Sequence, residues 1–390
     1  MPDKHNTYCT FPWEMYSIDV GFGWWRPCPR IDYQKLNDSQ FNNHEALVSL
    51  RKDLRNGVKN SLCNKCWKDE EQGIKSYRQV LKQDFKHPLI SLDTVKTPKV
   101  FEIKFSNLCN LKCVFCSNRC SSLWEREIPI ESDDYGSLHG DSVSTQSLDY
   151  LKENYSEIKV IQLFGGEPVL HKEFNQIFDL IKNAPTSAEK KTISFSTNLF
   201  FPENYRKSFE DNITTLLDLG HKLYMRISID GLKEQGEYLR TGLDWNVFEK
   251  NLFSFTEKFL DYPNLGRIKC NIALNITNLV YLDRIMDYLH SNNFGSITPH
   301  YNYVGKPERF MLQSYGKKLS TARKIIEKQN FYTFNTYKEH VLSLIGSMEK
   351  IEPDMNAIKD CKEWIDQYDQ GRTNKFLDLF PDNAYMFEGL

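Results

Sequence analysis

The chain has 390 residues, which is long enough for a large core and about two or three domains. Fifty Lys and Arg residues against 52 Asp and Glu residues leave a net charge of −2, which argues against a large electrostatic surface for nucleic acid. No apolar stretch reaches the roughly 18 residues of a membrane span, and the N-terminus lacks the apolar core of a signal peptide. We therefore expect a cytoplasmic protein without a membrane segment.

Residues 1–98 differ in composition from the rest of the chain. They are rich in aromatic residues, Pro, Asn and charged residues, and one helical pattern lies near 44–56. Four of the ten cysteines fall here. We predict a separate small, cysteine-rich domain over 1–98. The four cysteines are Cys9, Cys28, Cys63 and Cys66.

A repeating pattern of strands and helices runs from residue 99 to residue 305. Apolar residues at helical spacing predict helices at 171–183 and 279–291, the second with Asn278 as its N-cap. Alternating or continuous apolar runs predict the strands. The six predicted strands are 100–106, 159–164, 191–197, 222–229, 267–276 and 296–303.

Six strands joined by helices imply parallel βα units and an α/β fold. The length suits a partial (β/α)6 barrel, short of the usual eight units. In such folds the chemistry lies at the carboxyl ends of the strands. The polar and cysteine residues of this chain follow the first four predicted strands, so we expect them to form the site. These segments are 109–116, 165–168, 196–198 and 228–231.

Residues 306–390 show helical patterns and no clear strand. The predicted helices are 315–329, 336–349 and 355–369. We predict a helical C-terminal segment over 306–390, which caps the barrel or contacts a partner.

Cysteines grouped in a reducing compartment indicate metal or redox chemistry rather than a disulfide framework. Cys109, Cys113 and Cys116 place three thiolates on one short loop. Structural zinc takes four ligands and most iron–sulfur clusters take four cysteines, so three cysteines leave one iron of a [4Fe–4S] cluster open for a substrate. In the alternative, Cys120 completes a four-cysteine zinc site.

The sequence CNLKCVFC at 109–116 matches the CxxxCxΦC motif, so residues 99–305 resemble the radical S-adenosylmethionine (radical SAM) superfamily. The resemblance implies that Cys109, Cys113 and Cys116 hold a [4Fe–4S] cluster. It also implies that the open iron chelates the methionine part of S-adenosylmethionine, with Phe115 near the adenine.

Gly165, Gly166, Glu167 and Pro168 match the GGEP motif of the same family. Two glycines let the backbone approach a ligand closely, and a carboxylate pairs with an ammonium group. The resemblance assigns this motif to the methionine amino group. Without the family, the residues read as an ordinary glycine-rich turn.

Polar residues at the ends of the third and fourth predicted strands resemble further cofactor contacts of the family. Ser196 and Asn198 resemble residues that contact ribose or carboxylate, while Ser228 and Asp230 lie in an SIDG segment. As bare residues, all four are equally typical of turns. Other residues are ambiguous between ligand contacts and surface or core positions: Arg240, Asn275, Tyr301 and Tyr303.

The second cysteine set resembles the auxiliary-cluster domains of the superfamily, of the SPASM and twitch types. In those domains a Gly-x4-Cys segment forms a hairpin, and residues 18–28 fit this shape. The resemblance implies one auxiliary [4Fe–4S] cluster; zinc and no metal remain the alternatives. This domain precedes the barrel here, whereas it follows the barrel in the better-known members. The residues implied are Cys9, Cys28, Cys63 and Cys66.

Cys270 and Cys361 lie outside both groups, and we predict that they are buried apolar residues. Cys120 is undecided between an inert residue and a radical or proton donor.

The resemblance implies an enzyme that reductively cleaves S-adenosylmethionine to a 5′-deoxyadenosyl radical. That radical abstracts hydrogen from a peptide or a small molecule, oxidatively if an auxiliary cluster accepts the electron. A reductase such as flavodoxin or ferredoxin is the expected partner, and no nucleic acid is expected. Two alternatives remain: a radical SAM enzyme with structural zinc in place of the auxiliary cluster, and a non-enzymatic zinc-binding interaction protein.

Overall fold

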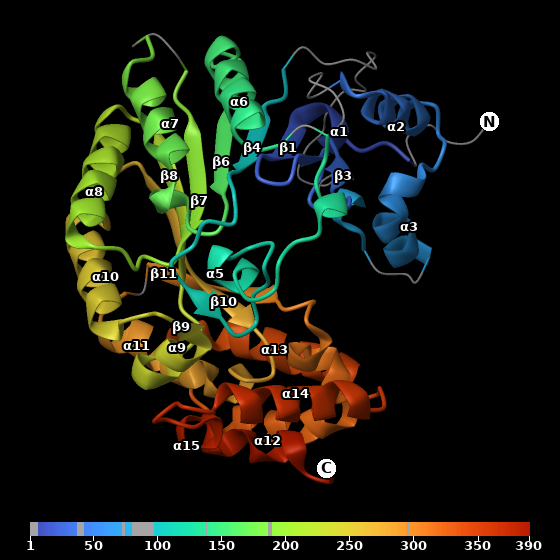
Figure 1. Ribbon diagram of the computed structural model, residues 1–390, viewed down its shortest axis with the longest axis vertical. Helices are drawn as coiled ribbons and strands as arrows, with labels where there is room; N and C mark the ends of the chain where they lie inside the picture. Colours follow the sequence, from blue (N-terminus) through green and yellow to red (C-terminus); the bar gives the residue numbers. More distant parts are fainter. Residues whose placement is uncertain are drawn as a thin grey trace. The chain divides into compact units, whose positions relative to one another are not determined.

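The computed structural model describes residues 7–36, 43–71, 75–79, 97–137, 139–185, 189–294 and 296–390. These residues form two compact units that are interleaved along the chain (Figure 1). The first unit comprises Met1–Leu108, Pro129–Phe195 and Asp218–Lys222, and the second comprises Cys109–Ile128, Ser196–Leu217 and Leu223–Leu390. Within the described ranges, no helix is long and apolar enough to cross a membrane.

The first unit is built on a mixed sheet. Its strands lie in the order β7-β6-β4-β1-β2-β3. The four strands from β7 to β1 run parallel, and β2 and β3 continue the sheet in antiparallel pairing. The bounds are β1 (Met15–Asp19), β2 (Trp24–Arg26), β3 (Gln34–Lys35), β4 (Val100–Lys104), β6 (Val160–Phe164) and β7 (Thr192–Thr197).

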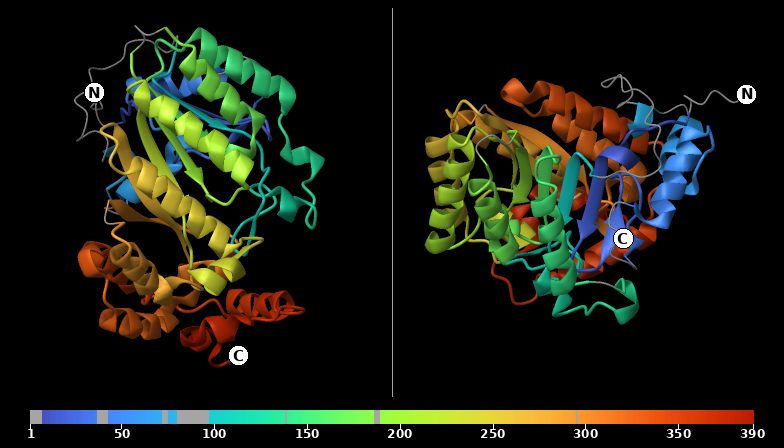
Figure 2. Two further views of the ribbon diagram at one scale, coloured as in Figure 1. Left: turned by 90° about the vertical axis from the view of Figure 1, so that its left-hand side faces the viewer. Right: turned by 90° about the horizontal axis from the view of Figure 1, so that it is seen from above.

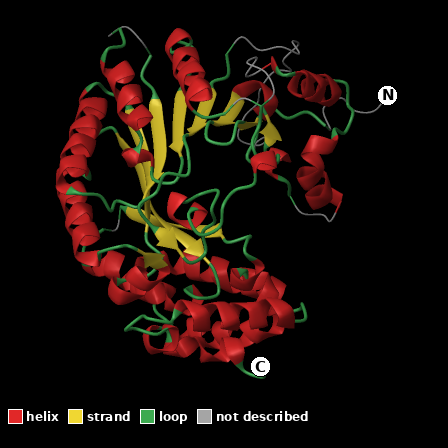
Figure 3. Cartoon of the chain, viewed as in Figure 1, coloured by secondary structure: helices red, strands yellow, loops and turns green. Residues whose placement is uncertain are grey.

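Helices of the first unit lie against this sheet (Figure 3), and aromatic side chains form part of the contact. Phe101 of β4 contacts Tyr150 of α6, with ring centroids 5.2 Å apart. Phe174 of α7 packs edge-on against Phe195 of β7. The helical elements are α1 (Phe11–Glu14), α2 (Glu45–Arg55), η2 (Ser61–Cys63), α3 (Asn64–Glu71), η3 (Ser132–Asp134), α6 (Asp141–Glu153), η4 (Pro168–Leu170) and α7 (Lys172–Lys182).

The second unit contains three parallel strands, β8 (Lys222–Ser228), β10 (Leu265–Leu274) and β11 (Ile297–Tyr303), in the order β8-β10-β11. A separate antiparallel pair joins β5 (Lys112–Cys113) to β9 (Arg240–Thr241). The helical elements here are α5 (Ser122–Glu125), α8 (Glu203–Asp218), α9 (Lys233–Leu239), α10 (Trp245–Phe259), η5 (Leu279–Tyr281) and α11 (Leu282–Ser291).

The two faces of the three parallel strands differ in chemistry. Ile227, Cys270 and Ile272 are each completely buried on one face. Arg226 and Lys269 alternate with them and are half-buried on the other face. This period of two places the polar side chains of all three strands on the same side.

The C-terminal segment consists of helices and short connecting loops (Figure 2), and no strand occurs among residues 306–390, all of which are described. Arg323 of α12 forms an ion pair with Glu349, which follows α13, at 2.8 Å. Asp354 caps α14 through the backbone N–H groups of Asn356 and Ala357. The elements are η6 (Glu308–Phe310), η7 (Leu312–Lys318), α12 (Leu319–Lys328), η8 (Tyr332–Phe334), α13 (Asn335–Met348), α14 (Met355–Tyr368), α15 (Phe376–Leu379) and η9 (Pro381–Phe387).

The predicted α/β class, with the parallel strands of a partial barrel and a helical C-terminal segment, is confirmed. Each of the six predicted strands is present. The predicted hairpin at 18–28 corresponds to the antiparallel pairing of β1 with β2. The sequence did not predict that β1 pairs in parallel with β4. The domain boundaries after residues 98 and 305 stay predictions, since the two compact units divide the chain at other positions.

Candidate functional site

The cysteine loop of the second unit, residues 109–120, is held by hydrogen bonds to its own backbone. The Trp124 indole N–H donates to the carbonyl oxygen of Cys113 at 2.8 Å. The Ser121 hydroxyl donates to the carbonyl oxygen of Leu111 at 2.7 Å. Cys113 is 9% exposed, whereas Cys109 and Cys116 are half-buried. The loop therefore has a fixed backbone with two partly accessible thiols.

Asn198 fastens this loop to the segment after β7. Its side-chain amide N–H donates to Oδ1 of Asn110 at 2.9 Å, and its own Oδ1 accepts the N–H of Phe200 at 2.8 Å. The Asn110 amide donates to the carbonyl oxygen of Phe200 at 2.6 Å. Both ends of the Asn198 amide are thus engaged in positioning the cysteine loop.

Arg240 lies beside the cysteines and was not expected there. It is opposite Cys113 in the β5–β9 pair and only 8% exposed. Its guanidinium donates to Oδ2 of Asp230 at 2.5 and 2.6 Å. Its charge acts on both Cys113 and Cys109. A buried cation near two thiols favours their thiolate form.

The thiols of the loop respond to these surroundings. Burial raises the pKa of Cys113 to about 11, and the Arg240 guanidinium acts in the opposite direction. A hydrogen bond with the thiol of Cys120, together with burial, raises the pKa of Cys116 well above its ordinary value. Cys116 and Cys120 are therefore close neighbours, and Cys120 is exposed.

Asp230 is fully engaged within the protein. Besides Arg240, it accepts the backbone N–H of Ala273 at 2.6 Å, and the Asn278 amide donates to its carbonyl oxygen at 3.3 Å. Burial raises its pKa, and Arg240 opposes this effect. Ser228, two residues earlier, is half-buried, as are Ser196 and Phe115.

The GGEP turn of the first unit packs tightly against the segment before Cys109. A Cβ atom on Gly166 would lie 2.4 Å from the carbonyl oxygen of Leu108 and 2.5 Å from that of Asn107. Gly165 has φ of +153°, and its own Cβ would lie 3.0 Å from the oxygen of Ser106. Backbone packing alone thus requires Gly166.

Glu167 of this turn is 1% exposed. Its carboxylate accepts the N–H of Val169 at 3.3 Å and so caps η4, which begins at the buried Pro168. His171 follows, and its ring Nε2 is buried without a hydrogen-bond partner. Burial lowers the pKa of His171, so its imidazole is neutral at pH 7.

The first unit brings the four N-terminal cysteines together. Cys63 interacts electrostatically with the other three, and Cys9 interacts with Cys28 and Cys66. Burial raises the pKa of Cys9 and Cys63 to about 12 and that of Cys28 to about 11. Such thiols are protonated at neutral pH unless a metal displaces the proton.

Arg78 lies beside two of these cysteines, Cys9 and Cys63. It is 5% exposed, forms an ion pair with Glu70 at 2.5 Å and lies over the ring of Trp67 at 4.6 Å. Its charge acts on Cys9 and Cys63, and its Nε–H is buried without a hydrogen-bond partner. Sequence reasoning missed Arg78, because no local pattern marks it.

The remaining candidate residues divide between core and surface. Cys270 and Cys361 are completely buried, as predicted. Asn275 is buried and bonds within its own turn. Tyr301 is 9% exposed with an unpartnered hydroxyl, whereas Tyr303 is exposed and contacts His340.

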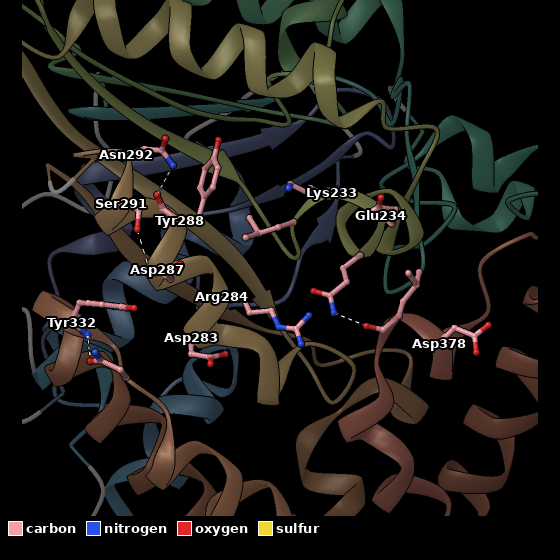
Figure 4. A pocket seen from close by; sticks show the side chains of 14 residues that line it. Lys233, Glu234, Asp283, Arg284, Asp287, Tyr288, Ser291, Asn292, Tyr332 and Asp378 are labelled. Carbon is pink, nitrogen blue, oxygen red and sulfur yellow. Dashed lines mark hydrogen bonds between the residues drawn. The ribbon is translucent and has the colours of Figure 1, made fainter.

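The second unit also has a pocket of about 700 Å³ that contains none of the predicted site residues (Figure 4). The charged residues that line the pocket are Lys233, Glu234, Asp283, Arg284, Asp287 and Asp378.

In the part of the chain that the structure describes, no three His, Cys, Asp or Glu side chains are spaced to hold a single metal ion.

The chain combines an α/β fold with a three-cysteine loop that follows its first predicted barrel strand. Residues 103–261 match the sequence profile of the radical SAM superfamily. This segment is less than half of the chain, and it contains both the cysteine loop and the GGEP turn. No curated protein matches the chain.

Two solved structures show distant similarity. anSMEcpe with bound AdoMet and Cp18Cys peptide is 21% identical, with a TM-score of 0.39 over 58% of this chain and 58% of that chain. SuiB of Streptococcus suis, bound to the precursor peptide SuiA, is 12% identical, with a TM-score of 0.36 over 84% and 70%. This chain therefore spans less than two thirds of the length of anSMEcpe.

Proposed function

We propose that this chain is a radical SAM enzyme whose catalytic [4Fe–4S] cluster is held by Cys109, Cys113 and Cys116. The observation that carries the proposal is the cysteine loop itself. Three cysteines lie on one fixed loop, Arg240 acts on two of them, and the loop lies within the segment that matches the superfamily profile. The donor set fits the cluster, since three thiolates leave one of four irons open.

Held by these three cysteines, a cluster would supply the electron for reductive cleavage of S-adenosylmethionine, and the 5′-deoxyadenosyl radical so formed would take hydrogen from the substrate. The chain's own residues position the cofactors. We assign Asn198 and Asp230 to this positioning role, because Asn198 anchors Asn110 and Asp230 holds Arg240. The proposed contacts of S-adenosylmethionine are Phe115, Gly165, Gly166, Glu167, Pro168, Ser196 and Ser228.

The proposal includes an auxiliary [4Fe–4S] cluster on Cys9, Cys28, Cys63 and Cys66. Mutual interaction of the four thiols supports a shared ligand. The buried, unpartnered Nε–H of Arg78 supports an anionic one, because four thiolates bring more negative charge than the metal core neutralises. A Zn²⁺ ion with four thiolates has the same net charge, so zinc is the competing occupant.

The proposed substrate is a peptide or a small molecule, and a flavodoxin or ferredoxin is the proposed electron donor. An auxiliary cluster on Cys9, Cys28, Cys63 and Cys66 would accept one electron from the substrate radical, and the net reaction would then be an oxidation of the substrate.

Anaerobic reconstitution with iron and sulfide tests the proposal. Wild-type protein should hold about eight irons, at four per cluster, and form 5′-deoxyadenosine when dithionite and S-adenosylmethionine are added. Cys113→Ala should abolish 5′-deoxyadenosine. Cys28→Ala should remove about four irons. Cys361→Ala, at a buried cysteine outside both groups, should change neither the iron content nor the formation of 5′-deoxyadenosine.

The outcomes separate the alternatives. About four irons plus one zinc, with activity, would move the N-terminal cysteines to zinc and keep the radical chemistry. A colourless protein that forms no 5′-deoxyadenosine would refute the proposal as a whole.

A further inference from the structure

A continuous row of polar side chains crosses one face of the sheet in the first unit. It follows the strands β2, β1, β4, β6 and β7, each of which contributes one residue at the same level. Residues that lie opposite each other on neighbouring strands share a face of the sheet, so these side chains stand side by side. In the order of the strands, the polar row is Arg26, Ser17, Glu102, Gln162 and Ser194.

The opposite face of the same strands is apolar. Phe101, Ile161 and Ile193, each next to a residue of the polar row, are completely buried, and α6 and α7 pack on that face. The polar row is also shielded from water, because Glu102 is only 5% exposed and Ser194 only 4%. Burying polar side chains is costly where their hydrogen bonds are not replaced, so packing alone does not account for the polar row.

The charges within the polar row cancel. Nη2 of Arg26 forms an ion pair with Oε1 of Glu102 at 3.3 Å, and the Ser17 hydroxyl donates to the same oxygen at 2.5 Å. The Arg26 guanidinium also lies over the ring of Tyr33, 4.2 Å from its centroid. These contacts fix the carboxylate and the guanidinium in place and leave the polar row without net charge.

Several groups of the polar row have hydrogen-bonding capacity that the protein does not use. The Nε–H of Arg26 is buried without a partner. Within the described ranges, no hydrogen bond reaches the Gln162 amide, the Ser194 hydroxyl or the second carboxylate oxygen of Glu102, Oε2. Buried polar groups are nearly always hydrogen-bonded, and each one that is not lowers stability. A ligand that bonded to these groups would remove that cost.

The chemistry of the unused groups selects the ligand. Oε2 of Glu102 accepts only, the Nε–H of Arg26 donates only, and the Gln162 amide and the Ser194 hydroxyl do both. A carboxylate or phosphate group has no proton for Glu102 and is repelled by its charge, whereas an ammonium group cannot accept from Arg26. A hydroxyl group donates and accepts. Since neighbouring strands are only about 4.8 Å apart, adjacent side chains of the polar row can reach hydroxyls on neighbouring carbons.

We propose that Glu102, Gln162 and Ser194 bind two hydroxyl groups on neighbouring carbons of a neutral small-molecule substrate, a sugar or another polyol. This inference rests on the proposed function and narrows its substrate class, because peptides lack such hydroxyl pairs. Gln162 precedes Gly165 of the GGEP turn by three residues, about 10 Å along the strand. The bound hydroxyls would therefore lie near the proposed contacts of S-adenosylmethionine.

Ligand-observed NMR titration of the reconstituted full chain with D-ribose, and separately with D-glucose, tests the inference. The first sugar has hydroxyl pairs on one side of its ring and the second has them on alternating sides, and at least one should bind. Gln162→Leu should weaken that binding about fivefold, equivalent to about 1 kcal/mol. Gln176→Leu, which removes an exposed glutamine of α7, is the matched control and should leave binding unchanged. Succinate, an anion, should not bind to the polar row.

Urea unfolding of the unliganded protein distinguishes a ligand site from a structural role. Because the Gln162 amide has no partner in the protein, Gln162→Leu should unfold at the same or a higher urea concentration than the wild type. A structural role predicts unfolding at a lower urea concentration, and that result would overturn the inference. The same curves show that each variant is folded.

Three further results would overturn the inference: no binding of either sugar, equal losses in the two leucine variants, or succinate binding that Gln162→Leu weakens. Sugar binding should persist when S-adenosylmethionine is saturating. Displacement of the sugar by S-adenosylmethionine would assign the polar row to the ribose of the cofactor and would also refute the inference.

Cleavage of S-adenosylmethionine, measured without substrate in the same preparations, separates this inference from the proposed function. Formation of 5′-deoxyadenosine without sugar binding would refute the hydroxyl site and leave the radical chemistry standing. Sugar binding that depends on Gln162 without 5′-deoxyadenosine would support the site and refute the radical chemistry.

Discussion

The ion pair of Asp230 and Arg240 allows a quantitative test of how the cysteine loop is supported. The Asp230 side chain is completely buried and that of Arg240 is 10% exposed. The carboxylate accepts two hydrogen bonds from the guanidinium and one from the backbone N–H of Ala273. Asp230→Asn removes the charge, keeps the volume and retains an oxygen that can accept from Ala273.

The expected loss follows from the charge left behind. Removing one partner of a buried ion pair costs about 3–5 kcal/mol, because the other charge stays buried and unpaired. Since Asp230→Asn keeps an acceptor for Ala273, we expect a loss near 3 kcal/mol. Asp230→Ala also leaves the Ala273 N–H unsatisfied, which adds about 1–3 kcal/mol.

Urea unfolding of the metal-free protein at pH 7, followed by tryptophan fluorescence, measures the loss. Asp360→Asn is the control, because Asp360 is 56% exposed in its ion pair with Arg309 and should lose no more than about 1 kcal/mol. The double variant Asp230→Asn with Arg240→Met should recover most of the loss. A loss below about 1 kcal/mol in Asp230→Asn would refute the view that this pair is tightly coupled.

Three further predictions concern the GGEP turn, the cluster and the cross-strand neighbours Arg226 and Lys269. Gly166→Ala should lower the free energy of unfolding by about 1–3 kcal/mol or more, because its Cβ would lie 2.4 Å from a backbone oxygen; thermal unfolding measures the loss. The control Gly305→Ala, which has open space around its Cβ, should lower the free energy of unfolding little. Arg240→Met should lower the reduction potential of the reconstituted cluster by about 40 mV, because the loss of the nearby positive charge costs about 1 kcal/mol and 59 mV corresponds to a factor of ten. Spectroscopic redox titration measures this potential. Arg240→Lys keeps the charge and should largely preserve the potential. Lys269→Met should stabilise the protein by about 0.5–1 kcal/mol, since it removes a like-charge pair with Arg226 on the neighbouring strand. It should also raise the pKa of His300 in NMR titration, because the Lys269 charge lowers that pKa.

Each of these three predictions has a result that would contradict it. Equal melting temperatures for the two glycine variants would show that the turn relaxes freely. An unchanged potential in Arg240→Met would remove the guanidinium from the electrostatics of the cluster. A less stable Lys269→Met protein would mean that the ammonium has a favourable partner.

Local pattern predicted most of the secondary structure. The apolar spacing of Phe174, Ile177, Phe178 and Ile181 predicted helix α7, and all four are buried in it. Strand periodicity likewise predicted β10 and β11 to within a few residues. These elements could be predicted because each buries one face, which imposes a period on the sequence.

Pairing between distant segments could not be predicted in the same way. The parallel register of β1 with β4 joins Ile18 to Ile103 across more than eighty residues, and no local signal specifies it. The opposition of Cys113 to Arg240 in β5–β9 has the same origin. Sequence alone therefore left Arg240 as a loop residue, whereas tertiary pairing buries it beside the cysteines.

Both cysteine groups have a buried arginine beside them, and this similarity supports the same kind of occupant at each. Arg78 acts on Cys9 and Cys63 and is held by Glu70; Arg240 acts on Cys109 and Cys113 and is held by Asp230. A guanidinium in a largely desolvated position is costly unless negative charge surrounds it. Thiolate-ligated clusters, whose net charge is negative, would make both buried arginines favourable, whereas protonated thiols would not.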